Sequence, residues 1–349
     1  MAKKILLTAF LYSTLSFAHH GVAALGAAGL EGPGAPLETS SSATLPEGSW
    51  LFYIKLDHVK WKKYSFQEFP DQKDTYDFFL YGIGYGLKPW LSVYLFTPYY
   101  VKTELKSINN DPAMGQYSYT NSGFADISLM AVLGFKYDRG FKLVPKNESL
   151  DDLMDWHFTV YGGVSVPTGN PNKYDRSRDP RGEFAADMAT GFGKPAFTVG
   201  FTSTKQLVSF PKLTFVFDTN YIKFLEHTYN FRDTPDSPKK KYKFGDEFRL
   251  NTALAYRLYT NMEKKFRADA LLEANFQYNQ RDKEDGVKLE GSGGKILYGV
   301  VGTRLYYKSI SLGAGIKIPV WKKLNEESQQ QGGEGKERYR LIITISALF

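Results

Sequence analysis

The residues with obvious chemical potential are few and scattered. The chain has five His and no Cys. His19 and His20 are adjacent and directly follow a predicted signal-peptidase site, so a free amine and two imidazoles would meet at the mature N-terminus. Imidazole suits Cu and Ni. His19 and His20 are therefore the one metal-site candidate, beside the plainer interpretation of a leader without metal.

Nucleophilic catalysis needs a Ser or Thr beside a His base and a group that orients the base. Beyond the N-terminus only His58, His157 and His227 are available. His58 and His227 have acidic sequence neighbours, Asp57 and Glu226, but neither pair forms a specific motif. The absence of Cys excludes thiol catalysis, iron–sulfur clusters and Cys-ligated zinc. We expect no enzymatic activity and no cofactor.

A larger set of polar residues occupies alternate positions between apolar ones. Such residues line the inside of a barrel if the apolar positions face outward. Two interpretations stay open: ion pairs that fill and stiffen the bore, or a lining that selects solutes by charge. The candidate lumen residues are Lys55, Asp57, Asp126, Asp218, Arg249, Arg257, Asp269, Glu273, Arg304, Lys317, Arg338 and Arg340.

The elements that carry these residues alternate with period two from Trp50 onward, in runs of about 11–14 residues, the length of a tilted transmembrane strand. In the last run, alternate residues from Tyr339 to Phe349 form an apolar face, and Arg338 and Arg340 begin the other face. We count twelve such runs. An even number closes an antiparallel barrel with both ends on one side. We predict an all-β transmembrane barrel over residues 48–349.

The connections between the runs alternate in length. Short links near 86–89, 207–212, 260–264 and 307–309 alternate with long polar ones. Outer-membrane barrels have short periplasmic turns and long external loops. The link 138–155 breaks this pattern. Counting connections alternately as periplasmic and external makes it periplasmic, although it is long. It predicts either a small helix around 148–154 or a strand pair missing from the count.

Composition separates the barrel from other classes. After residue 18 no apolar run approaches the roughly 20 residues of a transmembrane helix, and the mean hydropathy is −0.36. A soluble β-sandwich is the main alternative, but its strands are usually shorter, and aromatic residues recur here at strand ends, as in membrane-interface girdles. The net charge of +7 is spread along the chain, so we expect no nucleic-acid binding.

The first 47 residues differ from the rest. Lys3 and Lys4, the apolar run from Ile5 to Leu15 and a small-residue cleavage site predict a signal peptide over residues 1–18. Residues 19–47 are rich in Gly, Ala and Pro and have no strand period. They are either a flexible periplasmic leader or a plug that folds into the lumen.

Several stretches resemble one family of outer-membrane transporters. The terminal Phe349 on an alternating strand is similar to the signal that such barrels present to the barrel-assembly machinery, although Ala347 stands where an aromatic residue is commoner. Gly162–Gly169, Gly191–Gly193, Asn251–Tyr256 and the region from Arg281 through Pro319 to the closing strand resemble the family labelled "MetA pathway of phenol degradation". The resemblance implies a barrel related to importers of aromatic and long-chain hydrophobic compounds.

Together these features predict a channel in the outer membrane of a Gram-negative (diderm) bacterium, for passive or facilitated passage of a small, hydrophobic or aromatic solute. The alternative is a structural or partner-binding barrel that sheathes or docks a periplasmic redox or export protein. Expected partners are the solute, membrane lipid and lipopolysaccharide, whose phosphates the Lys239–Lys241 run could contact.

Overall fold

The computed structural model describes residues 35–62, 73–107, 113, 115–146, 154–172, 174–175, 182–183, 188–230, 238–325 and 337–349. The predicted signal peptide and the His19–His20 pair lie outside these residues, as does most of the segment in which a small helix was expected. No helix among the described residues is long and apolar enough to cross a membrane.

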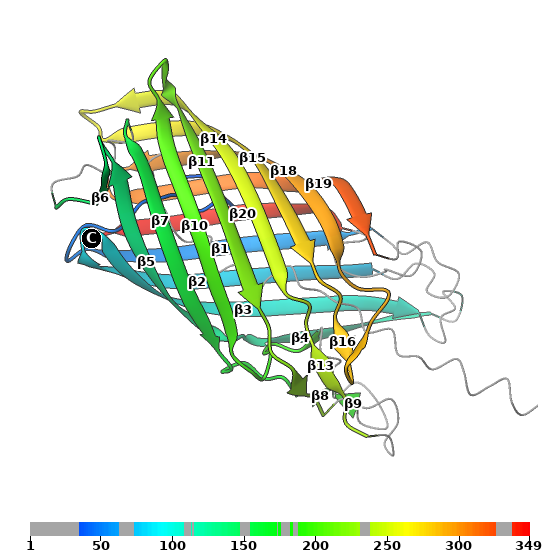
Figure 1. Cartoon of the computed structure of the whole chain (residues 1–349). Helices are drawn as coiled ribbons and strands as arrows, with labels where there is room; N and C mark the ends of the chain where they lie inside the picture. The colour runs from blue at the N-terminus through cyan, green and yellow to red at the C-terminus, as the bar shows by residue number, and fades with distance from the viewer. Residues whose placement is uncertain are drawn as a thin grey trace, which may run out of the picture.

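The chain forms a closed antiparallel barrel (Figure 1). Its main sheet contains 14 strands, of which β4 (Gln116–Phe124) and β6 (Phe141–Leu143) pair with one neighbour only. The other twelve complete the circle, and the β3–β5 pairing closes it. These are β1 (Trp50–Trp61), β2 (Lys73–Lys88), β3 (Leu91–Ser107), β5 (Ile127–Tyr137), β7 (Trp156–Val166), β10 (Ala196–Leu207), β11 (Phe210–Lys223), β14 (Glu247–Asn261), β15 (Phe266–Asn279), β18 (Gly294–Tyr307), β19 (Ile310–Leu324) and β20 (Glu337–Leu348). The predicted fold and strand number are confirmed.

The outer surface of the barrel is apolar because the strands alternate as predicted. β1 begins with strict exposed and buried alternation, and Leu272, Val301 and Val199 expose 56%, 61% and 55% of their surface in mid-strand. Exposed apolar residues on every second position cannot serve a core, since no residue of the described part of the chain covers them. They form the surface that meets lipid.

The two ends of the barrel chain meet at one rim. The Trp50 N–H donates to the Phe349 carbonyl and the Phe349 N–H donates to the Trp50 carbonyl, each at 2.8 Å. The short β2–β3, β10–β11, β14–β15 and β18–β19 turns lie at this same rim, which is therefore the periplasmic one. In Figure 1 it is the end that carries the C-terminus.

The long periplasmic link does not hide a strand pair. β6 folds back on β5, pairing Phe135 with Leu143 and Tyr137 with Phe141, and adds no strand to the circle. The interpretation of a missing strand pair is therefore wrong. The link is long because it contains this short hairpin beside the rim.

At the extracellular end, loop residues form two small sheets. The larger contains β12 (His227–Thr228), β13 (Lys241–Lys243), β16 (Lys283–Glu284) and β17 (Val287–Lys288) in that order. The smaller pairs β8 (Tyr174–Asp175) with β9 (Gly182–Glu183). The long β11–β14 and β15–β18 loops thus build one common structure above the barrel wall, visible at the lower right of Figure 1.

The outward apolar face predicts a depth-dependent cost for charge. Leu272→Arg, in the middle of β15, should destabilise the barrel by about 2–4 kcal/mol because an Arg at the bilayer midplane is poorly solvated. Val287→Arg, at a position 69% exposed in the extracellular sheet, should change stability little. Urea unfolding in liposomes measures both, and equal effects would mean that Leu272 does not face hydrocarbon.

Candidate functional site: the barrel lumen

Residues 35–45 of the segment 35–49 lie inside the barrel, where Glu273 of β15 holds their tip. The Glu273 carboxylate accepts the main-chain N–H groups of Leu37 and Thr39 at 2.6 and 2.9 Å, and the Thr39 hydroxyl at 2.7 Å. Glu273 lies at mid-strand, so the tip reaches the middle of the lumen. A carboxylate that accepts several N–H groups fixes an irregular backbone much as a cap fixes a helix end.

A salt-bridge network attaches the same tip to β1 and β19. The Glu38 carboxylate pairs with Lys55 of β1 and, at 2.6 Å, with Lys317 of β19. Lys55 also contacts Asp57 at 3.2 Å. Although burial by itself would raise it, the pKa of Glu38 is lowered from its ordinary value by the ammonium groups of Lys317 and Lys55. Glu38 is therefore ionised and bound at neutral pH.

Leu37 fits a socket made of glycines. Gly302 of β18 and Gly313 and Gly315 of β19 face it, and a Cβ atom on any of them would overlap the Leu37 side chain. Next to the socket, Arg304 donates to the Pro36 carbonyl at 2.8 Å. The glycines allow the segment to approach the wall closely, and Arg304 anchors its backbone there.

Both arms of the segment descend to the periplasmic rim. On one side the Ala35 N–H donates to the Tyr306 hydroxyl at 3.2 Å. On the other, Ser42 contacts the Thr202 hydroxyl at 2.7 Å, and the Leu45 N–H donates to Ser92 at 2.8 Å. Residues 35–49 therefore form a loop that enters the lumen from the periplasmic side and leaves it on that same side.

One sector of the inner wall is apolar and aromatic, which sequence reasoning missed. It consists of inward side chains of β1, β2, β3 and β5, each at most 5% exposed: Tyr53, Val59, Trp61, Tyr76, Phe78, Leu80, Tyr94, Phe96, Tyr100, Met130 and Val132. The alternation rule assigned the lumen to polar residues only. The available signal was that residues 76–83, which belong to β2, are apolar at nearly every position and so have two apolar faces.

The remaining sector is polar and strongly paired. Asp218 of β11 accepts hydrogen bonds from Tyr161 and Asn251 at 2.8 and 2.7 Å, and Arg340 of β20 pairs with Glu337 at 2.6 Å. Among the predicted lumen residues, Lys55, Asp57, Asp126, Asp218, Asp269, Glu273, Arg304, Lys317 and Arg340 are buried, and Arg249 and Arg257 are half-buried.

Arg338 is the exception, and its predicted place in the lumen is wrong. The β1–β20 ladder shifts where Lys60 pairs with Tyr339 and Trp61 with Glu337. This bulge leaves Arg338 out of the ladder and exposes its side chain, while Glu337 takes the inward position. A bulge changes the face of every residue beyond it, and the apolar pattern on either side did not indicate one.

Asp126 lies in a break of the barrel wall instead of in its lining. β3 pairs with β5 near the periplasm and with β4 farther out, but β7 pairs with β5 only up to the Ile127–Val166 contact. Among the described strands none pairs with the second edge of β4. At the break, Asp126 accepts the N–H groups of Gly169 and Phe192 at 2.8 Å each. The Thr168 hydroxyl accepts the Ile127 N–H at 2.9 Å. Side-chain and loop contacts therefore hold the seam in place of strand pairing.

A second segment covers the apolar sector from the extracellular side. Asn121 of β4 donates to the Met188 carbonyl at 2.7 Å and Lys102 of β3 to the Ala189 carbonyl at 3.1 Å. The Met188 side chain packs in the same apolar cluster as Tyr76. Residues 188–192 therefore link the aromatic wall to the seam at Asp126.

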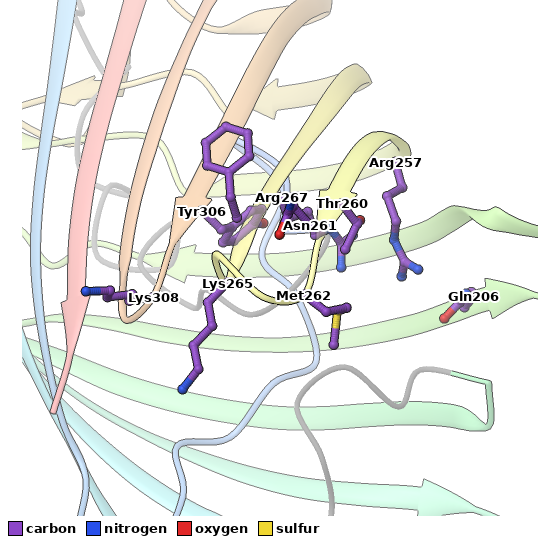
Figure 2. A pocket seen from close by; sticks show the side chains of 10 residues that line it. Gln206, Arg257, Thr260, Asn261, Met262, Lys265, Arg267, Tyr306 and Lys308 are labelled. Carbon is purple, nitrogen blue, oxygen red and sulfur yellow. The ribbon is translucent and has the colours of Figure 1, made fainter.

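A cavity of about 580 Å³ opens at the periplasmic mouth (Figure 2). Its walls combine apolar groups, Met262, Phe266 and Tyr306, with cationic ones, among them Arg257 and Lys265. The Arg257 Nε is buried and has no hydrogen-bond partner among the described residues. The mouth is thus cationic and partly apolar, close to the point where Ala35 reaches the rim.

The histidines do not gather into one site. His58 contacts Asp77 at 2.6 Å, His157 the main-chain oxygen of Asp155 at 3.2 Å, and His227 stacks edge-on against Tyr229. The three come from different regions of the chain. Among the described residues, no group of three or more His, Asp or Glu side chains is arranged to hold a metal ion.

Comparison with solved structures supports the same architecture. The COG4313 outer membrane channel from Pseudomonas putida F1 is similar at TM-score 0.62 and 14% identity, over 88% of this chain and 98% of that one. The beta domain of the Bordetella autotransporter BrkA follows at TM-score 0.44 and 7% identity, over 87% and 100% of the two chains. The first shares the fold of this chain.

At the level of sequence, no curated protein matches. A family profile described as "Putative MetA-pathway of phenol degradation" matches residues 80–318, more than half of the chain. The matched region runs from the aromatic inner face of β2 to β19, so it includes both the apolar and the polar sector of the lumen. The chain is therefore a twelve-stranded outer-membrane β-barrel that belongs to the family described as putative MetA-pathway of phenol degradation.

Proposed function

We propose that this barrel is a channel for small amphiphilic solutes with an aromatic or otherwise hydrophobic body. The observation that carries the proposal is the two-sided lumen, apolar and aromatic over β1–β5 and charged over β10–β20. A channel for water-soluble ions alone has no need of an aromatic half. A structural barrel whose bore is filled by its own side chains would not need both an aromatic and a charged surface.

The aromatic sector supplies a surface on which a flat apolar solute can pack. Trp61 meets Tyr76 at 4.5 Å between ring centroids, and Phe78 meets Tyr100 at 5.3 Å, both edge to face. Rings held in this geometry are rigid, so a solute that replaces one contact loses little entropy. In the charged sector opposite, Arg249 pairs with Glu247 at 2.8 Å and Arg340 with Glu337 at 2.6 Å. This sector therefore offers charged groups of both signs to the polar head group of a solute.

The break beside Asp126 supports sideways access from the membrane. Hydrophobic solutes concentrate in the lipid, and the aromatic sector lies directly inside the wall that contains the break. The seam there depends on Asp126 and the loops around Gly169 and Phe192 in place of a continuous strand ladder. Opening it would break side-chain and loop contacts, such as those of Asp126 and Thr168, without breaking the strand pairing of the rest of the wall.

The loop of residues 35–49 supports the plug interpretation of the N-terminal region, because it must move or leave a gap for a solute to reach the periplasm. Its contacts, the Glu38 pairs and the Leu37 socket, are specific to one position in the lumen. We infer that they hold the channel closed at rest. The alternative function, a structural sheath, predicts that weakening these contacts opens no path.

Glu38→Gln and Leu37→Ala should each raise the single-channel conductance several-fold. Glu38→Gln removes the charge that Lys55 and Lys317 bind. Leu37→Ala empties the glycine socket, and a Leu-to-Ala change in a packed site lowers the stability of the packed state by about 2–5 kcal/mol. Glu47→Gln, on the same segment but exposed and paired only with Lys88 among the described residues, is the matched control. Unchanged conductance in both test variants would contradict a plug.

The same contact has a defined pH dependence. Because the pKa of Glu38 is lowered in the folded state, the stabilisation is complete above its ordinary pKa and is lost only as pH falls toward the lowered value. Wild-type conductance should stay constant from neutral pH down to about pH 4 and rise in stronger acid. Glu38→Gln should show the higher conductance over the whole pH range. A conductance of Glu38→Gln that still rises in acid would argue against Glu38 as the titrating group.

The aromatic wall should govern uptake of apolar solutes. Phe78→Asn places an amide in the apolar sector and should slow entry of an aromatic acid into proteoliposomes several-fold, with less effect on a small sugar. Phe79→Asn, the next residue on the lipid-facing side, is the matched control. Equal loss for both solutes would mean that the substitution narrowed the pore without changing its preference.

Arg257 should influence charge selectivity at the periplasmic mouth. Because its Nε is buried and unpaired among the described residues, Arg257→Glu should shift the reversal potential in planar bilayers toward cation preference. Lys212→Glu changes charge by the same amount at an exposed position of the same rim. Identical reversal potentials for wild type and Arg257→Glu would exclude Arg257 from the conduction path.

A further inference from the structure

We propose that the outer face of the extracellular sheet β12–β13–β16–β17 binds the phosphate groups of lipopolysaccharide. The sheet pairs Lys243 of β13 with Lys283 of β16, and Lys283 with Lys288 of β17. Directly opposite residues share a face, so three lysines form a row across three strands. Lys241, two residues before Lys243, lies on the same face.

A row of like charges opposes the folding of the sheet that contains it. Opposite-charge pairs stabilise neighbouring strands and like charges directly opposite destabilise them. In this row only Lys243 has an acidic partner among the described residues, Asp246 at 3.1 Å. Lys283 and Lys288 form no ion pair with any described residue. An external anion would remove the repulsion.

The row is also held rigidly. On the opposite face Tyr242 is 2% exposed and its hydroxyl donates to Asp282, which also accepts the Gly245 N–H at 2.7 Å. Phe192, Phe224 and Phe244 pack around it with centroids 5.0–6.0 Å apart. The lysines therefore cannot separate by bending the sheet, and their spacing is prepared for an anion.

Lysines also occur at the extracellular ends of the barrel strands. Lys295 of β18 pairs with Lys323 of β19 across the ladder, again a like-charge pair. Both side chains are exposed, and Lys295 lies 5.7 Å above the Tyr278 ring. These residues are at the extracellular ends of their strands, the level at which the head groups of the outer leaflet lie, and clustered lysines at that level bind anionic lipid head groups.

The Lys239–Lys241 run does not act as a unit. Strand alternation turns Lys240 to the inner side, where it pairs with Glu284 at 2.6 Å, and leaves Lys241 outside. The surface that fits phosphate combines Lys243 with Lys283 and Lys288, which lie 40 and 45 positions farther along the chain, and only the sheet brings them together. Lipopolysaccharide carries several phosphates on a compact head group, a better match for a row of lysines than a single small anion.

The test is binding of fluorescent rough lipopolysaccharide to the purified full-length protein in detergent. The triple variant Lys243→Gln/Lys283→Gln/Lys288→Gln should lower affinity at least about tenfold, since each lysine near an anionic surface contributes. The control Lys146→Gln/Lys212→Gln/Lys264→Gln makes the same charge change at exposed periplasmic positions and should stay within about twofold of wild type.

Two further measurements identify the ligand group. Dephosphorylated lipopolysaccharide should bind wild type as weakly as the intact form binds the triple variant, and inorganic phosphate should not compete at millimolar concentration. Equal affinity of wild type and triple variant, or equal binding of both lipopolysaccharides, would overturn the proposal, and competition by phosphate would assign the row to a free anion. If the triple variant does not fold, the single variant Lys288→Gln, at the exposed edge of the sheet, replaces it. This variant should weaken lipopolysaccharide binding measurably, and unchanged binding would also overturn the proposal.

Discussion

Hydrocarbon offers no partner for a backbone N–H or carbonyl, so every strand that crosses the membrane must satisfy both of its edges with neighbouring strands. In this chain twelve strands, with the β3–β5 pairing that completes the circle, meet the condition over most of the described wall. The reciprocal bonds between Trp50 and Phe349 bring the first and last strands together at the periplasmic rim. Strand geometry alternates the side chains between two faces, and closure makes one of these faces an apolar outside and the other an enclosed inside.

Closure also makes the inside a separate chemical space. A twelve-stranded barrel is narrower than the 16–18-stranded porins that leave an aqueous channel, and here much of the space is occupied by the chain itself. Residues 35–49 enter the lumen from the periplasm, and residues 188–192 cover the aromatic sector from the extracellular side. The inner wall has adapted to the first segment: Gly302, Gly313 and Gly315 leave room for Leu37, and Glu273 accepts its backbone. The tight fit gives a physical reason to regard the segment as part of the mechanism.

Among the described strands, one gap in the ladder lies beside the aromatic sector. At Asp126 the wall changes partners, and side-chain and loop contacts replace strand pairing. A weak seam costs stability in a membrane, because unpaired backbone is expensive there. Its position next to an apolar inner surface, with the charged sector on the other side of the lumen, is what a route for an amphiphilic solute requires.

Much of this architecture was predictable from residue order alone. Alternation over Phe266–Tyr278 or Tyr339–Phe349 needs only the geometry of a strand to predict which side chains face lipid, and the number of runs predicts closure. Inward positions such as Lys55, Glu273 and Lys317 follow from the same rule. The apolar inner face of β2 could also be predicted, because its sequence is apolar on both faces. The rule that every apolar residue faces outward led to the opposite expectation.

What period two could not determine depends on contacts between distant residues. The bulge that exposes Arg338, the change of partner at Asp126, the socket for Leu37 and the lysine row from Lys243 to Lys288 each arise where separate strands meet in a particular register. Register between strands reflects the packing of the whole barrel, and a shift of one residue exchanges the two faces. The order of residues thus determined that a barrel forms and which faces meet lipid, whereas only the tertiary structure decided what meets inside it and at its rims.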